Sequence, residues 1–238
     1  MREGGQKLAA ILAVLIKKTQ IGISTKEIDN LAEKMIIDAG GVPSFKGYDG
    51  FPASICASIN EEVVHGIPSE IILKEGDIFS IDIGMFYKGF HTDMAATIAL
   101  GKVSFEARRL ICATKKALKY GIKKARVGNT FGDIGNTIQR YIEDQGFSVI
   151  RDLCGHGIGR DLHEDPPILN FGRRHTGPLI KSGMTFCIEP MVAAGGWEIK
   201  RAKNGQTYIT RDKSLSAHFE HTIAVTDQGA QILTQTAD

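Results

Sequence analysis

The chain contains an internal repeat, and a duplicated sequence restricts the fold to one built from two similar halves. Residues 16–40, IKKTQIGISTKEIDNLAEKMIIDAG, align without a gap with residues 122–146, IKKARVGNTFGDIGNTIQRYIEDQG. Each copy is typical of a helix end, a turn that contains glycine, and a second helix that stops at glycine. Ser24 and Thr130 each precede an acidic residue by three positions, which predicts a capping box at the start of each second helix.

The repeat continues downstream of these helices. Residues 74–84, KEGDIFSIDIG, align with residues 181–191, KSGMTFCIEPM, and the motif Thr-Ile-Ala recurs at 97–99 and 222–224. An acidic residue stands at a matching place in each copy, and even spacing along a strand keeps side chains on one face. The acidic residues that the repeat pairs in this way are Asp82 with Glu189 and Asp93 with Glu220.

The order of the elements predicts an α+β fold of two αα-ββ halves, about 1–103 and 104–238, around an approximate two-fold axis. Strand patterns follow the helices in each half. The expected strands are residues 78–83, 94–100, 185–188 and 221–226. No segment rich in proline, glycine or serine separates the halves, so we expect them to share one sheet in a single domain, residues 1–238.

The apolar run at residues 8–16, LAAILAVLI, resembles the core of a signal peptide. It is too short to span a bilayer, no cleavage-like site follows it, and it occupies the place of residues 110–124 in the second copy. We therefore expect a core helix there, and neither a signal peptide nor a membrane anchor.

Charge and cysteine content exclude several classes of protein. Lys and Arg number 29 and Asp and Glu number 27, so the net charge of +2 argues against a dedicated nucleic-acid binder, DNA-binding proteins included. A basic group lies in one predicted helix, where a solvated helix face is the simpler interpretation. Its members are Lys115, Lys116, Lys119, Lys123 and Lys124. The cysteines form no CxxC pair, which argues against structural zinc and disulfides and favours a reducing, cytoplasmic compartment. They are Cys56, Cys112, Cys154 and Cys187.

The paired acidic residues have the pattern of a metal site. Four carboxylates that converge near a two-fold axis repel one another strongly unless positive charge lies between them. A charged carboxylate on a buried strand is also costly, and two divalent cations would neutralise the cluster. His156, between glycines in CGHGIG, adds an imidazole, a combination that suits Mn, Fe, Co or Zn better than Mg or Ca. Independent surface acids are the alternative, which the repeat disfavours.

A dinuclear centre activates water and polarises a carbonyl, so it also needs side chains that move protons and orient the substrate. His163 follows His156 in an irregular loop rich in glycine and proline, and His65 occupies the matching loop of the first half. Both are candidates for the same cavity. We expect a structural or surface place for the remaining histidines, which are His91, His175, His218 and His221.

Five segments closely resemble the methionine aminopeptidase family, type I. They are SINEEVVHGIP (58–68), DIGMFYKGFHTDMA (82–95), CGHGIGRDLHEDP (154–166), TFCIEPMV (185–192) and SLSAHFEHTIAVT (214–226). The resemblance implies the pita-bread fold of the creatinases and aminopeptidases, whose duplicated halves surround a curved antiparallel sheet. The segment between His163 and Glu189 is short, whereas type II enzymes that resemble this family carry a long helical insertion there.

The resemblance implies a place for each candidate ligand. Asp82 would chelate one metal ion, and His156 with Glu189 would hold the other. Asp93 and Glu220 would bridge the two ions. The resemblance leaves the identity of the metal open among Co, Mn, Fe and Zn.

The implied reaction is hydrolysis of the N-terminal methionine from a nascent polypeptide whose second residue is small. A hydroxide that bridges the metal ions would attack the first peptide carbonyl, with Glu189 as the general base. His163 would contact the scissile carbonyl and stabilise the tetrahedral intermediate. His65 would contact the peptide on the leaving side.

The family's methionine pocket is apolar and aromatic, and Tyr48, Phe51 and Cys56 fit that pattern. Leu162 stands where an aromatic residue is frequent, and Gln206 stands where tryptophan is common. An apolar wall discriminates methionine from its competitors by about 1–3 kcal/mol per group. The chain therefore departs from the family pattern in the pocket, while its metal ligands match.

The resemblance also implies further partners. Asn60 and Ser216 match positions that help to hold one monovalent cation in relatives. The basic group would allow a transient contact with the ribosome, and an internal two-fold axis that completes the site predicts a monomer.

Two alternative functions share the fold. Proline-specific peptidases and creatinase-like proteins usually carry an additional N-terminal domain, for which we expect no room in this chain. Non-catalytic relatives, which bind peptides, ribosomes or RNA, have lost metal ligands, whereas all five are present here.

Overall fold

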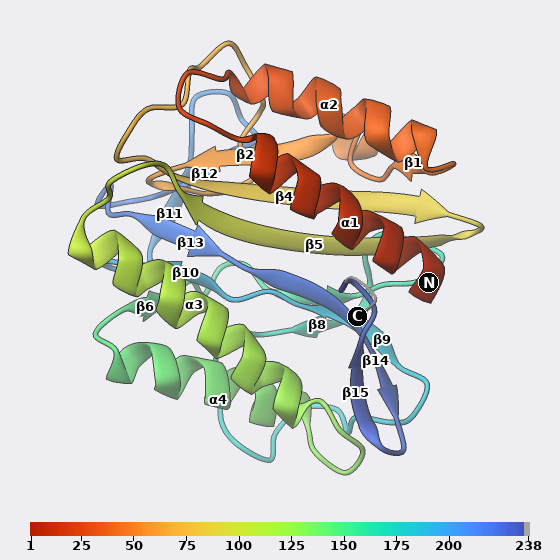
Figure 1. Cartoon of the computed structure of the whole chain (residues 1–238). Helices are drawn as coiled ribbons and strands as arrows, with labels where there is room; N and C mark the ends of the chain where they lie inside the picture. The colour runs from red at the N-terminus through yellow and green to blue at the C-terminus, as the bar shows by residue number, and fades with distance from the viewer. Residues whose placement is uncertain (236–238) are drawn as a thin grey trace.

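The structure of the protein is a computed structural model that describes residues 1–235. Its helices form two pairs, one in each half of the chain (Figure 1). They are α1 (Arg2–Lys18), α2 (Thr25–Asp38), α3 (Phe105–Lys124) and α4 (Phe131–Asp144). A short 3₁₀ helix, η1 (Tyr48–Gly50), follows the first pair. No helix among residues 1–235 combines the length and the apolar character needed to cross a membrane.

One antiparallel sheet joins the two halves. Its strand order is β1-β4-β5-β14-β9-β7-β8, with β2 paired to β4 and β15 paired to β14, and both halves of the chain contribute strands. Its strands are β1 (Val42–Pro43), β2 (Ile55–Ile59), β4 (Ile78–Tyr87), β5 (Phe90–Ala99), β7 (Gly155–Gly157), β8 (Glu164–Ile168), β9 (Thr185–Ile188), β14 (Glu220–Thr226) and β15 (Gly229–Ile232). The halves meet where β14 pairs with β5, in the register Glu220 to Ala95 and His221 to Met94.

Two smaller antiparallel sheets complete the described part of the chain. The first is built from β6 (Ser148–Val149), β10 (Met191–Ala193) and β13 (Ser216–His218). The second is built from β3 (Glu62–Val64), β11 (Ile199–Arg201) and β12 (Tyr208–Thr210). The second of these sheets brings the two halves together, since β3 belongs to the first half and pairs with β12 of the second.

Each helix pair covers its own half of the sheet with its own apolar core. Leu8, Leu12 and Leu15 of α1 are almost fully buried against α2, β2, β4 and β5. The corresponding core of the second half joins α3 and α4 to β9, β10 and β14. Figure 1 shows both helix pairs in front of the sheet. The apolar run at residues 8–16 is therefore part of a core helix, as predicted, and the α+β pita-bread architecture is confirmed.

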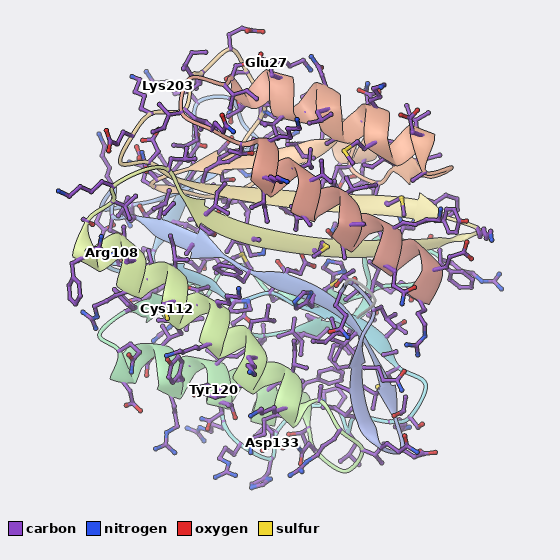
Figure 2. All side chains as sticks on the ribbon, viewed as in Figure 1. Glu27, Arg108, Cys112, Tyr120, Asp133 and Lys203 are labelled. Atoms are coloured by element: carbon purple, nitrogen blue, oxygen red, sulfur yellow. The ribbon has the colours of Figure 1, made fainter. Side chains whose placement is uncertain are left out.

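The helix starts that the repeat predicts are present in both copies. Ser24 and Glu27 form a reciprocal capping box, with the Ser24 amide donating to the Glu27 carboxylate at 2.8 Å and the Glu27 amide donating to the Ser24 hydroxyl at 3.2 Å. Asp133 accepts from both the amide and the hydroxyl of Thr130, each at 2.9 Å. Figure 2 places Glu27 and Asp133 at opposite ends of the molecule. These contacts satisfy amides that a helix leaves unpaired in its first turn.

Some elements differ from the prediction in extent. The second-copy helix begins at Phe105 rather than near residue 110, because Ser104 caps it by accepting from the Ala107 amide. The stretch around His156, expected to be irregular throughout, contains the short strands β7 and β8. Their pairing is interrupted between Gly155 and Gly157, so the alternating pattern of a regular strand is missing there.

Candidate metal centre

Strand alternation turns the acidic residues of the first half away from the helices. Ile81 and Ile83 of β4 pack in the core beneath α1 and α2, so the intervening Asp82 points to the opposite face of the sheet. Met94 of β5 lies in the same core, which turns the adjacent Asp93 toward the face that Asp82 occupies.

The second half repeats this arrangement. Phe186 and Ile188 of β9 pack against α3 and α4, so Glu189, directly after the strand, turns away from them. Ile223 of β14 lies in the same core, and Glu220, three residues earlier, takes the other face. All four carboxylates therefore belong to one face of the central sheet.

The four carboxylates are buried and incompletely hydrogen bonded. Their residues are 2–9% exposed. One oxygen each of Asp82, Asp93 and Glu220 is buried without a hydrogen-bond partner. Ligand atoms of these three residues lie within 4.8 Å of one another. A buried polar atom without a partner is costly, and a divalent cation would satisfy all three oxygens at once.

The pKa shifts show how poorly this cluster tolerates its own charge. Burial raises the pKa of Asp82, and it raises the pKa of Asp93, Glu189 and Glu220 well above their ordinary values. Repulsion from Glu220, Asp82 and Glu189 adds to the shift at Asp93. Among residues 1–235, no lysine or arginine forms an ion pair with any of the four carboxylates. The donor set thus fits bound metal ions, and would be unfavourable without them.

His156 is oriented to offer one ring nitrogen to the same site. Its Nδ1 lies 2.8 Å from the carbonyl oxygen of Gly157, and because a carbonyl only accepts, Nδ1 carries the proton. Nε2 then carries an unprotonated lone pair and lies 3.7 Å from Oε1 of Glu189. Burial lowers the pKa of His156 to about 4, which keeps the ring neutral and able to bind a metal. This pairing of a carbonyl with the ring is the usual arrangement behind a metal-binding histidine.

Close backbone packing explains the glycine before His156. A side chain at Gly155 would place its Cβ 2.3 Å from the carbonyl oxygen of Cys187, a distance that no packed structure allows. The glycine therefore lets β7 approach β9 and brings the His156 ring to the acidic cluster.

Cys187 also lies within reach of the cluster. Its sulfur groups with His156 and Glu220 within 4.8 Å, and it is fully buried. Burial raises the pKa of the thiol well above its ordinary value, and the nearby Glu220 and Asp93 raise it further. Glu220 has a buried oxygen without a hydrogen-bond partner, whereas the Cys187 sulfur already contacts the Thr222 hydroxyl at 3.5 Å, so Glu220 is the better candidate ligand of the two. Glu220 belongs to both groups of ligands, which suits a bridging carboxylate.

His163 lies beside the cluster and is held by Tyr48. The hydroxyl of Tyr48 is 2.8 Å from Nδ1 of His163, and the rings of His163 and His156 stand edge to face with centroids 4.4 Å apart. Burial lowers the pKa of His163. When Tyr48 donates to Nδ1, the Nε2 of the neutral ring carries the proton and can donate to a substrate oxygen.

His65 lines the cavity from the first half. Its backbone has a positive φ of 56°, and Thr207 fixes it by donating its hydroxyl to the His65 carbonyl at 3.0 Å. Its ring meets that of Tyr208 edge to face at 5.8 Å. Burial lowers the pKa of His65 to about 4, with smaller contributions from His218, His163 and Arg201.

His218 is the site residue that sequence reasoning missed. It is 1% exposed, and its Nε2 lies 3.4 Å from Oε2 of Glu189. The two groups are close enough for an ion pair, but burial lowers the pKa of His218 and raises that of Glu189, and both shifts oppose such a pair. Strand alternation gave no signal for it, because His218 ends β13 and Glu220 begins β14.

The other histidines lie in the structural or surface positions expected. His91 and His221 pair through Nδ1 with the hydroxyls of Ser44 and Thr234, at 2.9 and 3.0 Å. His175 is exposed, with its ring 3.5 Å from a carboxylate oxygen of Asp133.

A cavity of about 820 Å³ opens above the carboxylates. All five predicted ligands line it, as do both candidate histidines. Phe51, Cys56 and Leu162 belong to one compact apolar cluster at its wall, where Phe45 and Ile158 join them. Tyr48 and Gln206 line the cavity as well. An apolar wall beside a polar centre is the usual form of a small-molecule or peptide site.

Asn60 and Ser216 are neighbours at the edge of this region. The Ser216 amide donates to the Asn60 carbonyl at 2.8 Å. The Asn60 side chain is engaged within the fold, since it donates to Asp77 at 2.9 Å and accepts from the Ile78 amide at 3.0 Å. A monovalent cation at this pair stays a prediction.

Comparison with known proteins gives one consistent result. The model of metallopeptidase family M24 matches residues 1–227. A methionine aminopeptidase of Clostridium perfringens is 49% identical over 234 residues, which cover 98% of this chain and 94% of that relative. The methionine aminopeptidase of Escherichia coli is 43% identical over 240 residues, covering 100% of this chain and 91% of its own length.

Solved structures agree with the sequence relatives. The crystal structure of a methionine aminopeptidase from Thermotoga maritima matches with a TM-score of 0.97 at 41% identity, over 99% of this chain and 95% of that one. A prolidase from Pyrococcus furiosus matches with a TM-score of 0.79 at 22% identity, over 100% of this chain and 63% of that one, which shows a shared fold alone.

Proposed function

The chain belongs to metallopeptidase family M24 as a metallo-aminopeptidase of the methionine aminopeptidase group, and from this premise we propose its reaction in detail. It removes the N-terminal methionine from nascent polypeptides whose second residue is small, using two divalent metal ions. The observation that carries this proposal is the convergence of four buried carboxylates, three of them with an unpartnered oxygen, on one face of the sheet.

The residues fit two adjacent metal sites. One group of potential ligands consists of Asp82, Asp93 and Glu220. His156 belongs to a second group, which also contains Glu220. The position of Glu189, 3.7 Å from Nε2 of His156, supports its role as a ligand of the second ion. Asp93 and Glu220 are the bridging carboxylates of this proposal.

Bound metal ions would supply an activated water and polarise the scissile carbonyl. Within the chain, Glu189 accepts the proton of the attacking water at a carboxylate oxygen and delivers it to the leaving amine. His163 donates from Nε2 to the carbonyl oxygen of the substrate as negative charge develops there. His65 contacts the peptide beyond the scissile bond. These roles rest on the cavity that all three residues line.

The apolar cluster of Phe51, Cys56 and Leu162 supports a pocket for the methionine side chain. Leu162 is 2% exposed and fills the pocket wall where an aromatic residue is frequent in relatives. Gln206 lines the cavity in the place of a tryptophan. We expect methionine to remain the preferred first residue, with weaker rejection of other apolar residues than in enzymes with an aromatic wall.

A peptide panel tests the proposal. Metal-free protein would be loaded with Co, Mn, Fe or Zn and assayed on Met-Ala-Ser, on X-Ala-Ser with other first residues, and on X-Pro peptides. Release of methionine from Met-Ala-Ser in at least one metal form, with two metal ions bound per chain at saturation, is the expected result. Preferential cleavage of X-Pro peptides would instead favour the proline-specific alternative, and saturation at one ion would reject the dinuclear centre.

The basic group on α3 supports a second contact, with ribosomal RNA. Lys115, Lys116 and Lys119 are exposed on α3, and Figure 2 labels Arg108 and Tyr120 on the same helix. We expect weak, salt-sensitive co-sedimentation with ribosomes, lost when these lysines are replaced by glutamine. Equal sedimentation of wild type and variant at low salt would dismiss this contact.

Three further expectations accompany this function. Acting on nascent chains places the protein in the cytoplasm, in agreement with four cysteines that form no disulfide. The internal two-fold arrangement of β5 and β14 builds the cavity from one chain, which predicts an active monomer. Light scattering of the active protein and fractionation of cells test these two. Sodium and potassium titrations followed by thermal melting test the cation at Asn60 and Ser216.

A further inference from the structure

One exposed arginine lies at the rim of the cavity. Arg201, at the end of β11, lines the cavity together with Tyr208 of the neighbouring strand β12 and Gln206 of the turn between them. It is exposed to solvent, but its guanidinium is held in place. Nε and Nη2 donate to the hydroxyl of Tyr208 at 3.1 and 3.0 Å, and Nη1 donates to the carbonyl of Gly205 at 3.4 Å.

The positive charge of Arg201 is not neutralised within the fold. No carboxylate of residues 1–235 lies within ion-pair distance of its guanidinium. Its partners are a phenol and a carbonyl, which accept hydrogen bonds without removing the charge. The charge acts on the reaction cavity, since it contributes to the lowered pKa of His65 after the larger effects of burial, His218 and His163. A fixed and unneutralised guanidinium beside a substrate cavity is typical of a carboxylate-binding group.

The two sides of the cavity differ in charge. Asp49, Glu164 and Asp165 line it next to Tyr48 and His163. Arg201 lines it next to Tyr208, whose ring contacts that of His65. Two separate apolar clusters mark these sides, one built around Phe51 and Leu162, the other around Val64 and Tyr208.

This asymmetry orients a peptide. The side chain of the first residue takes the apolar pocket around Phe51 and Leu162, because Cys56 of that cluster pairs with Asp82 between β2 and β4 and so lies beside the carboxylates. The rest of the peptide then leaves past the side that His65, Tyr208 and Arg201 line. An extended chain advances about 3.3 Å per residue, so the residues soon after the scissile bond pass the cavity rim at Arg201.

We propose that Arg201 is a specificity-determining residue that binds a carboxylate of the substrate at its third or fourth residue. The enzyme thereby favours polypeptides that begin with methionine, a small residue and then an acidic residue. This inference rests on the proposed function and names the substrate class of the same site. Electrostatic attraction at an exposed site is modest, so the preference is about two- to fivefold in kcat/KM and weakens as salt is added.

Paired peptides with amidated C-termini test the preference. Met-Ala-Ser-Ser is the neutral reference, and Glu or Lys replaces the serine at position three or position four. Wild-type enzyme is expected to cleave the Glu peptide about two- to fivefold faster than the Lys peptide at low salt. Met-Ala-Ser with a free C-terminus forms a separate arm, because its terminal carboxylate offers the same chemistry. A gain with the free acid alone would assign Arg201 to short peptide ends and overturn the side-chain proposal.

Variants at Arg201 separate charge from structure. Arg201→Gln is expected to bring the Glu to Lys ratio to about one, Arg201→Glu to invert it, and Arg201→Lys to retain part of it. Inversion is the decisive result, since damage to the loop lowers both rates without reversing their order. Lys200→Gln and Lys203→Gln are matched controls, because both lysines are exposed near Arg201 but do not line the cavity.

Different results would reject the proposed function and the role of Arg201. Absence of any methionine release from the neutral reference peptide would reject the proposed function. Normal release with an equal rate for Glu and Lys peptides, or with a ratio that Arg201→Gln leaves unchanged, would reject the role of Arg201 and leave the proposed function intact.

Discussion

The imidazole of His218 faces the carboxylate of Glu189, with Nε2 3.4 Å from Oε2. That nitrogen is buried and has no hydrogen-bond partner, and a small movement would bring it within hydrogen-bond distance of the carboxylate. Oε1 of the same carboxylate lies toward His156. We therefore expect the His218 imidazole to orient one oxygen of the proposed base, while the other oxygen remains for the metal ion and the water.

His218→Ala is expected to lower kcat about tenfold with little change in KM, and to weaken metal binding, because groups that orient metal ligands have effects of this size. His218→Gln should retain most activity, since an amide nitrogen can donate in place of Nε2. Kinetics on Met-Ala-Ser and calorimetric titration of metal into metal-free protein measure both effects. Equal loss in the Ala and Gln variants would contradict the orienting role.

The repeat made the acidic cluster predictable from the sequence. Asp82 lies between two isoleucines of β4 that pack under the helices, and Glu189 directly follows Ile188 of β9, which packs in the equivalent core. Because the period of a strand is two residues, their common face follows from the pattern alone. The helix starts at Ser24 and Thr130 were predictable for a similar reason, since a capping box is a local interaction.

Other parts of the site depend on contacts that the linear sequence does not show. The hydroxyl of Tyr48 reaches His163 across 115 residues, from a short 3₁₀ helix in which Asp49 has a positive φ of 46°. His218 ends one strand before Glu220 begins the next, so no single strand pattern joins them. The guanidinium of Arg201 reaches the cavity through the pairing of β11 with β12. These positions are decided by tertiary packing.

Tyr48→Phe tests how His163 is held. The ring of Tyr48 remains, but the hydroxyl that fixes Nδ1 of His163 is lost, so we expect kcat to fall about five- to tenfold with metal content unchanged. In a His163→Ala background the same change should cause no further loss, because the two residues then act as one unit. Tyr120→Phe on α3 is the control for a surface tyrosine. Additive losses in the double variant would separate Tyr48 from His163.

Asp93→Asn removes one charge from the centre of the cluster. Burial, Glu220 and Asp82 raise the pKa of Asp93, so the charged form destabilises the metal-free protein. We expect the metal-free variant to melt about 2–4 °C above metal-free wild type, the shift that about 1 kcal/mol produces in a chain of this size. Activity should be lost, and added metal should raise the melting temperature less than in wild type.

Asp152→Asn is the control, since Asp152 is exposed and lies outside the cavity. It should change neither the melting temperature nor the response to metal. A lower melting temperature for metal-free Asp93→Asn would mean that Asp93 stabilises the fold by itself, which would contradict the need for bound cations.

Asp133 should make the start of α4 sensitive to acid. Burial opposes ionisation of this carboxyl group, but hydrogen bonds from Thr130 and from the His175 amide outweigh it and lower the pKa of Asp133. A pKa lowered in the folded state adds stability that is complete above the ordinary pKa of aspartate and is lost as the pH falls through the folded value. Asp133→Asn should therefore cost about 1 kcal/mol of unfolding free energy at neutral pH and progressively less near pH 3.

Urea unfolding of wild type and Asp133→Asn between pH 3 and pH 8 measures this difference. Glu27→Gln provides the matched variant, because Glu27 has the same place in the first copy of the repeat and its pKa is lowered by hydrogen bonds from the amide and hydroxyl of Ser24. Both variants should show a loss of stability that shrinks toward acid. A difference that grew as the pH fell would mean that the protonated carboxyl group makes the stabilising contact, and the sign of the linkage at both helix starts would be reversed.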